Sequence, residues 1–394
     1  MLSNRFLSVC TAGILLFCLA QPVQAQDSTQ TDTLLQSIQQ QMNSQENDTQ
    51  ASGQSGQSGR SATATTNPDI SVIGDFQTRY HSEGERNWDA YVNSMEINFS
   101  SVIDPYARAE FFPVLEGEGG DLHLHLEEAY LRTLSLPLNL QLKVGKFRQQ
   151  FGRMNLTHRH ALPVIDVPVA YESFMGEAMI DQGASLSWLI PNQSFYQELI
   201  VDVTRGPGNS PLFAYSEEND PKLTAHLKNF WSLTENATFE LGFSGAVGDN
   251  EFGGRSRLGG VNLTYIWKPV RMNTYKSFEW QAEFFFSRLE RPQPDNDLVV
   301  EPDLNENAWG MYTWIRYQLG RRWHLTGMYS YGENPQNPAM AEQAVSAYLG
   351  WYATEFQKLE IGPRISTENN FGDTAFSGLF RWVFVIGSHG AHEY

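Results

Sequence analysis

Apolar and polar residues alternate with a period of two from Asn67 to the end of the chain, and this pattern most limits the possible folds. In DLHLHLEE, for example, three leucines share one face of an extended segment, and His123, His125 and Glu127 share the other. Such alternation is typical of β-strands with one apolar face. Sixteen segments show it, at residues 69–80, 90–103, 105–113, 120–133, 138–149, 177–190, 194–205, 222–232, 237–248, 256–267, 275–289, 306–319, 321–332, 343–355, 357–366 and 375–387.

The connections between these segments alternate between long and short. Eight are long, among them PVLEGEGG, ENPQNPAMAEQ and RPQPDNDLVVEPDLNE, and seven are short, among them IDP and LGRR. Short turns at one end, long loops at the other and an even strand number are typical of outer-membrane barrels. Closure is required because an open sheet edge would leave backbone groups unpaired in lipid. We therefore predict an all-β protein, a transmembrane antiparallel β-barrel of about 16 strands over residues 67–394, in the bacterial outer membrane and surrounded by its lipid.

The first 25 residues have the pattern of a secretory signal peptide. Arg5 gives a basic start, an apolar stretch follows, and small residues lead to a cleavage site after Ala25. The apolar stretch is too short to span a membrane as a helix. We expect residues 1–25 to be removed on export.

Residues 26–66 are rich in Gln, Ser, Thr and Gly, and they predict a low-complexity periplasmic leader. Within it, Leu35, Ile38 and Met42 have helical spacing. This spacing leaves two possibilities open, a short helix that aids oligomerisation or a plain linker.

The composition excludes several classes of protein. Both cysteines, Cys10 and Cys18, lie in the signal peptide, so the exported chain has no disulfide framework. The net charge is −18 and no basic patch is present, which disfavours nucleic acid as a partner. No G-x-S-x-G elbow is present either, so we predict no enzymatic activity and no cofactor.

The longest connection, THRHALPVIDVPVAYESFMGE at residues 157–177, is apolar and contains two prolines. A long apolar loop should pack against something rather than extend into water. As the third outward loop, it would most simply fold into the barrel lumen and narrow it. Its polar residues would then line or brace the constriction: His158, Arg159, His160, Asp166 and Glu172.

Charged residues and histidines recur on the inward faces of the predicted strands. Both signs are present, and no dense basic run appears. We expect most of them to brace the barrel wall, and those near the third loop to set selectivity. The predicted lumen-facing residues are Asp75, Arg79, Glu96, Arg108, Glu110, His123, His125, Glu127, Lys143, Lys228, Glu283, Arg316 and Arg381.

Four histidines leave a metal site open as an alternative. His158 and His160 lie in the third loop, and His123 and His125 lie on one face of a nearby strand. Imidazoles and carboxylates are the usual ligands of zinc. The spacing matches no closed structural pattern, so these histidines are also expected as solvated or hydrogen-bonded lumen residues.

Several segments carry a resemblance to known proteins. LQLKVGKFRQQFG, residues 140–152, resembles the V-G-K-F-x-x-x-F-G segment of the phosphate-selective porin O and P-like superfamily. NPDISVIGDF, HLEEAYLRTLSLP, DVPVAYESF and VFVIGSHGAH resemble bacterial outer-membrane proteins often labelled zinc-regulated or TonB-dependent receptors. The resemblance covers roughly residues 67–394. It implies a porin fold with an inserted third loop, and a homotrimer.

The resemblance does not extend to every property of these groups. Phosphate-selective channels use arginine and lysine ladders, which this chain lacks. TonB-dependent receptors have 22 strands and a folded plug of well over a hundred residues, whereas about 40 residues precede the first strand here. We therefore predict a porin for passive diffusion of small hydrophilic solutes or ions. A zinc-linked uptake channel or receptor and a non-conducting structural barrel stay open as alternatives.

Overall fold

The structure is a computed structural model, and it describes residues 68–82, 87–118, 121–206, 208–214, 220–292, 304–368 and 374–387. The chain divides into two compact units, Met1–Ala64 and Thr65–Tyr394, and the described residues belong to the second. The predicted signal peptide and leader lie outside the described residues. No helix in the described ranges is long and apolar enough to cross a membrane.

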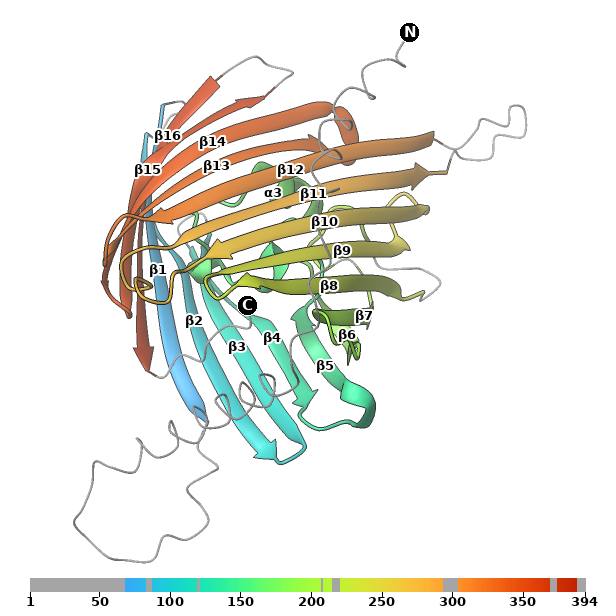
Figure 1. The fold of residues 1–394 in the computed structure, drawn as a ribbon. Helices are drawn as coiled ribbons and strands as arrows, with labels where there is room; N and C mark the ends of the chain where they lie inside the picture. Colours follow the sequence, from blue (N-terminus) through green and yellow to red (C-terminus); the bar gives the residue numbers. More distant parts are fainter. Residues whose placement is uncertain are drawn as a thin grey trace, which may run out of the picture. The chain divides into compact units, whose positions relative to one another are not determined.

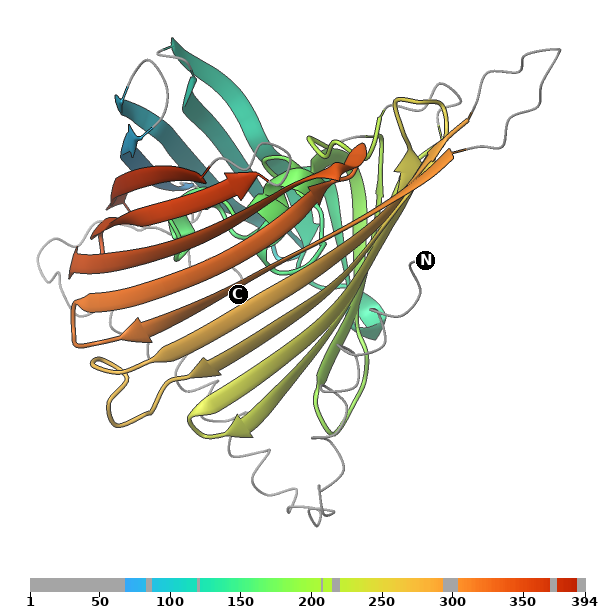
Figure 2. The same cartoon turned by 90° about the horizontal axis from the view of Figure 1, so that it is seen from above.

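Sixteen strands form a closed antiparallel barrel, in which each strand pairs with its neighbours in sequence and β1 pairs with β16 (Figures 1 and 2). This confirms the predicted fold class. Every predicted segment contains a strand. The strands are β1 (Asp69–His81), β2 (Trp88–Asp104), β3 (Ala107–Glu118), β4 (Asp121–Thr133), β5 (Leu140–Arg148), β6 (Ile180–Leu189), β7 (Tyr196–Thr204), β8 (Lys222–Thr234), β9 (Ala237–Asp249), β10 (Arg255–Trp267), β11 (Phe278–Arg291), β12 (Leu304–Gln318), β13 (Trp323–Asn334), β14 (Asn337–Thr354), β15 (Gln357–Glu368) and β16 (Thr374–Gly387).

The outer face of the barrel is apolar, as the alternation requires. In β11, Phe284 and Phe286 are 41% and 57% exposed, whereas the alternate residues Glu283 and Phe285 are buried on the inside. Large apolar side chains that are exposed on the outside of a closed barrel are suited to contact with lipid. The inward residues are therefore those that determine what the lumen contains.

Two connections that the sequence predicts to be long are short in the structure. Only two residues separate β3 from β4, and two separate β13 from β14. Glycine and proline in these stretches favour loops, but both hairpins continue through them. Pro113 lies at a register irregularity. Proline has no backbone N–H, and at this position the missing donor does not interrupt a regular ladder of hydrogen bonds.

The same irregularity changes which residues of β4 point into the lumen. Phe112 pairs with Glu128 and Pro113 pairs with Leu126, so Glu127 is an extra residue on its strand. Such a bulge breaks the period of two. Glu127 lines an internal cavity, and the next residue, Glu128, is also buried on the inside. Two consecutive carboxylates therefore face the lumen.

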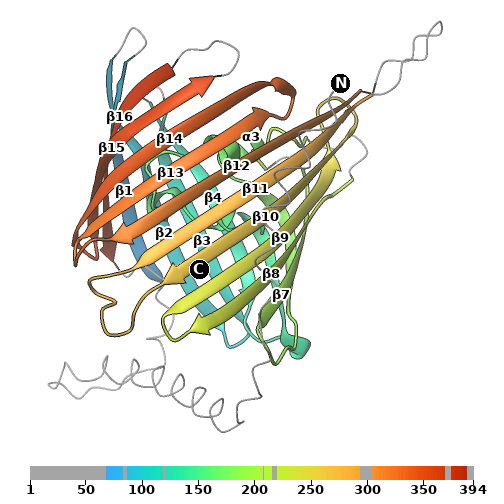
Figure 3. The ribbon, with the colours of Figure 1, turned by 45° about the horizontal axis from the view of Figure 1, so that its top comes forward.

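The third loop, residues 149–179 between β5 and β6, folds inside the barrel (Figure 3). It contains two short 3-10 segments, η3 (Met154–Leu156) and η4 (Arg159–Ala161), and the helix α3 (Val169–Met175). Its apolar side chains pack on the inner wall from β9 to β16, together with Leu212 and Phe213 of the fourth loop. The wall residues of this core are Ala246, Leu258, Phe285, Leu289, Ala308, Tyr312, Trp314, Met328, Tyr348 and Leu379.

Glycines in the wall allow α3 to lie close to the strands. A Cβ atom at Gly310 of β12 would lie 2.8 Å from Phe174 Cε2 and 3.2 Å from Ala170 Cβ. A Cβ atom at Gly332 of β13 would lie 2.9 Å from Ala170 Cα. Ordinary carbon–carbon contacts are about 3.5–4.0 Å, so a side chain on any residue other than glycine at these two positions would overlap with α3.

Candidate functional site

One buried asparagine ties the two ends of the third loop together. Asn155 Nδ2 donates to the carbonyl of Gln149 at 2.7 Å and to that of Met179 at 3.2 Å. Its Oδ1 accepts from the Met179 N–H at 2.8 Å and from the Tyr171 hydroxyl at 2.7 Å. A buried amide with all its partners in place fixes one geometry. These hydrogen bonds therefore join the two ends of the loop independently of its contacts with the barrel wall.

Charged side chains attach this unit to the wall between β9 and β11. Glu283 Oε1 accepts the backbone N–H groups of Arg153 at 2.7 Å and Met154 at 2.9 Å. Arg153 Nη1 donates to Glu240 Oε2 at 2.7 Å, and Lys228 Nζ lies 3.5 Å from the same oxygen. Glu283 therefore acts as a brace for the loop backbone.

A second attachment joins the loop to β15 and β16. Arg381 donates to the carbonyls of Leu162 at 2.7 Å and Arg159 at 3.2 Å, and Lys358 donates to Leu162 at 3.1 Å. Arg381 Nε also donates to Glu360 Oε2 at 2.7 Å. These cations cap loop carbonyls that would otherwise be buried without partners.

Asp166 makes a further contact with this side of the wall. Its Oδ2 lies 3.1 Å from Arg364 Nε, and its carboxylate accepts from the Ser346 hydroxyl. Burial raises the pKa of the Asp166 carboxyl, and the positive Arg364 opposes that shift only in part. The loop is thus fixed to β14 and β15 by an ion pair as well as by apolar packing.

On the wall formed by β2 and β4, His158 bridges carboxylates of both strands. Its Nδ1 lies 2.9 Å from Glu96 Oε2 and 3.6 Å from Glu127 Oε2, and its Nε2 lies 3.0 Å from Glu128 Oε1. Burial alone would lower the pKa of His158, but Glu96, Glu127 and Glu128 together raise it to about 10. The imidazole therefore carries a positive charge at neutral pH.

His160 approaches the same carboxylate from the other end of the turn. Its Nδ1 lies 3.3 Å from Glu96 Oε2. Glu96, His158 and His160 each offer one potential ligand atom, and these atoms all lie within 4.8 Å of one another. His123 is on the exposed part of β4, and His125 lies 4.0 Å from Glu116. The structure therefore groups the two loop histidines with Glu96 rather than with the two histidines of β4.

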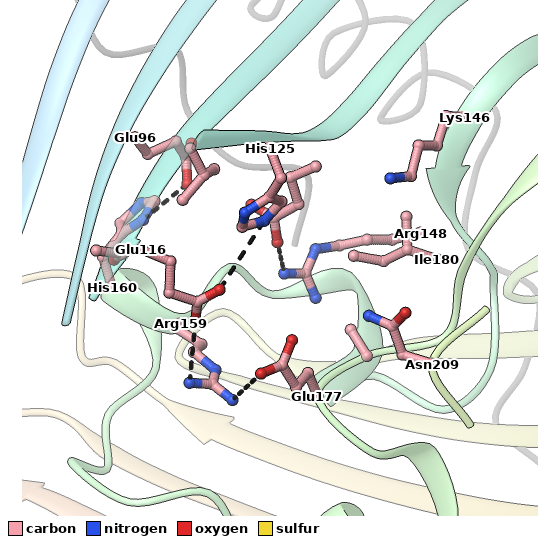
Figure 4. Close-up of a pocket in the computed structure, with 14 residues that line it drawn as sticks. Glu96, Glu116, His125, Lys146, Arg148, Arg159, His160, Glu177, Ile180 and Asn209 are labelled. Atoms are coloured by element: carbon pink, nitrogen blue, oxygen red, sulfur yellow. Dashed lines mark hydrogen bonds and ion pairs between the residues drawn. The ribbon is translucent and has the colours of Figure 1, made fainter. Parts of the chain in front are cut away.

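Polar cavities lie between the third loop and the strands from β2 to β8. One is lined by residues of both signs from β2 to β6 and from the loop, including Glu96, Glu116, His125, Arg148, Arg159 and His160 (Figure 4). Arg159 lies between Glu116 and Glu177 there, 3.7 and 4.0 Å away. Another is lined by side chains that include Lys143, Glu198 and Lys228. The loop thus has an apolar side and a polar side.

The remaining predicted residues lie on the wall or are exposed. Asp75 accepts hydrogen bonds from Gln77 and Asn93, and Arg79 donates to Gln77. Glu110 pairs with Arg108 at 3.3 Å and with Arg132 at 3.3 Å. Arg316 lies 3.6 Å from Glu279 and donates to Tyr352. In the loop, Glu172 is an exposed residue of α3.

The sequence prediction missed four residues that matter to this arrangement. Glu128 is the second carboxylate at the β4 bulge, and Arg148 donates to Glu127 and lies 3.8 Å from Glu128. Asn155 closes the loop, and Lys358 caps one of its carbonyls. Only the proline opposite the two consecutive glutamates could have indicated the bulge, because prolines within sheets favour such positions.

Comparisons with known proteins agree with this architecture. No protein-family model matches the chain. An uncharacterized protein of Aquifex aeolicus (strain VF5) is 27% identical over 349 residues, which are 80% of this chain and 72% of that protein. The fold and the inserted loop together define a porin-like β-barrel.

Solved structures show which proteins share this fold. The outer membrane channel DcaP of Acinetobacter baumannii superposes with a TM-score of 0.57 at 11% identity, over 84% of this chain and all of that chain. The anion-selective porin from Comamonas acidovorans gives 0.54 at 7% identity, over 81% and 99%. OmpF of Salmonella typhi gives 0.54 at 10% identity, over 81% and 97%. The chain is therefore similar in fold to outer-membrane porins and channels.

Proposed function

We propose that this protein is an outer-membrane channel through which small hydrophilic solutes or ions diffuse passively. One observation carries the proposal: the third loop buries its apolar side against β9–β16 and turns its polar side toward charged cavities along β2–β8. A lumen narrowed on one side by a fixed loop leaves a polar path on the other. Solutes would be selected there by width and by the field between opposite charges.

The comparisons support this function without fixing the solute. Two solved structures of the same fold are described as a channel and as an anion-selective porin. The cavities of this chain contain both signs of charge, so ion preference follows from the balance between them. The resemblance of residues 140–152 to phosphate-selective porins supports this proposal through the shared porin fold. It does not identify phosphate as the solute. No catalytic step or cofactor is part of it.

Export and assembly are part of the same proposal. Residues 1–25 would direct export and residues 26–66 would remain in the periplasm, beside a barrel set in outer-membrane lipid. A homotrimer is proposed because related porins form trimers, and one solved structure of this fold, OmpT of Vibrio cholerae, is described in a trimer form. Native gel migration and cross-linking of the refolded protein test this state.

Single-channel recording of the refolded protein in a planar bilayer tests the function. Stable open steps are expected, and the reversal potential under a salt gradient gives the preferred sign of ion. A barrel that shows heat-modifiable migration on a gel but passes no current would overturn the proposal. The third loop would then seal the lumen, and the barrel would be structural.

A further inference from the structure

The buried cluster of Glu96, His158 and His160 has the geometry of a metal site. Its shared oxygen, Glu96 Oε2, lies 2.9 Å from His158 Nδ1 and 3.3 Å from His160 Nδ1. Zinc binds nitrogen and oxygen at about 2.0–2.2 Å, which places tetrahedral ligands about 3.3–3.6 Å apart. The observed separations fall close to that range.

The surroundings of His158 are those of a metal ligand. Its Nδ1 faces Glu96 and its Nε2 lies 3.0 Å from Glu128 Oε1. A carboxylate on the far nitrogen fixes the tautomer and orientation of a ligating histidine. Glu128 is itself held, because its Oε2 accepts the backbone N–H of Arg148 at 2.9 Å. The carboxylate that would orient a metal-bound His158 is therefore already held in place.

Glu96 offers a further indication. It is only 4% exposed, and its Oε1 atom has no hydrogen-bond partner in the structure. A buried carboxylate oxygen without a partner is costly. A cation bound by both oxygens of the Glu96 carboxylate would give Oε1 a partner.

The charges around the cluster favour a divalent cation. Glu96, Glu127 and Glu128 carry three negative charges, and Arg148 carries one positive charge against Glu127. With neutral imidazoles, two negative charges remain. A divalent ion would balance them, and it would take the place of the proton on His158 Nδ1 while the contact with Glu128 persists.

The site is also reachable from the lumen. Glu96, Glu127 and His160 all line the polar cavity between the third loop and β2–β6, and Figure 4 shows His160 directed at Glu96. The three cluster residues are themselves at least nine-tenths buried. A small ion could therefore enter, whereas larger ligands would be excluded.

We propose that this cluster binds one divalent transition-metal ion of the zinc class, which joins the third loop to β2. Glu96, His158 and His160 supply its protein ligands, and Glu128 orients His158. Because its ligands are buried and come from both the third loop and β2, the ion would hold the loop to the wall rather than be transported. The inference does not depend on the channel function, because binding is measured without current.

Zinc titration by calorimetry, with metal analysis after dialysis, tests the proposal on the refolded barrel stripped with a chelator. We expect one Zn²⁺ per chain. His160→Ala and Glu96→Gln should each weaken binding at least about 100-fold, and Glu128→Gln about 10- to 100-fold. Co²⁺ should give the visible absorption of a tetrahedral site, and the same variants should abolish it.

His123→Ala is the matched control, because this histidine lies on β4 outside the cluster. It should retain one Zn²⁺ with unchanged affinity. Heat-modifiable gel migration shows that each variant has folded. The proposal is overturned if the folded parent protein binds no Zn²⁺, or if His123→Ala weakens binding as much as His160→Ala. In the first case His158 would act only as a charged link between the carboxylates.

Discussion

Gly310 lies on the inner face of β12 and close to α3, so Gly310→Val tests how the third loop is held. The new Cβ atom would lie 2.8 Å from Phe174 Cε2 and 3.2 Å from Ala170 Cβ. Phe174 is fully buried and has no space to retreat into. Valine is itself favourable in a strand, so the penalty falls on the loop rather than on β12.

The magnitude follows from this overlap. Overpacking a well-packed core costs about 1–3 kcal/mol, which corresponds to about a 5- to 150-fold rise in the population of displaced loop. Valine adds two methyl groups beyond the Cβ atom, so the free-energy cost should lie toward the upper end of this range. Strand pairing should be retained because the closest overlap is with the loop; the nearest strand atom, the Tyr331 carbonyl oxygen, would lie 3.2 Å from the new Cβ atom.

Limited trypsin digestion measures the effect, since Arg153 and Arg159 lie within the loop. Cleavage at these arginines should accelerate by the same factor, and single-channel current should become larger and noisier. Gly327→Val is the matched control, because a Cβ atom at Gly327 of β13 meets no atom within 4 Å. If the two variants are cleaved at the same rate, packing against the wall does not hold the loop, and the reasoning fails.

Three further substitutions probe other contacts of the lumen. Asn155→Ala unpairs buried backbone groups at about 1–3 kcal/mol each, so the loop should be cleaved faster by trypsin; unchanged cleavage would contradict its role as a tie. Arg381→Met leaves Glu360 buried without its guanidinium, at about 3–5 kcal/mol, and should lower the temperature of heat modification. Lys143→Gln removes a positive charge from a polar cavity and should shift the reversal potential toward cations; an unchanged potential would place that cavity off the conduction path.

The sequence predicted the strands because the information they need is local. Alternation along β11 determines which side chains face lipid and which face inward, whatever the other strands do. The same argument failed at β4, where the bulge beside Pro113 turns both Glu127 and Glu128 inward. A single extra residue reverses the alternation of inward and outward side chains beyond it. The sequence of β4 alone does not show where that residue lies.

The candidate site was predicted only in part, because its members are distant in the chain. His158 and His160 could be singled out by their place in the third loop, but Glu96 comes from a strand 62 residues earlier than His158. A grouping of His123 and His125 with the loop histidines was as reasonable from sequence. Only the fold shows that the loop histidines meet β2 instead.

The sequence by itself determined the strand number, the apolar outer face and the insertion of an apolar third loop, because hydrophobic periodicity and loop composition act within each segment. The tertiary structure decided which wall that loop contacts. Barrel closure places β2 and β4 across the lumen from the wall of β9–β16, so the loop histidines meet carboxylates of β2 and β4 while the apolar side chains of the loop pack on β9–β16. The contacts on both walls, which include the carboxylates of Glu240 and Glu283 on β9 and β11, depend on strand register and on bulges, which are set by pairing between distant segments rather than by any one of them.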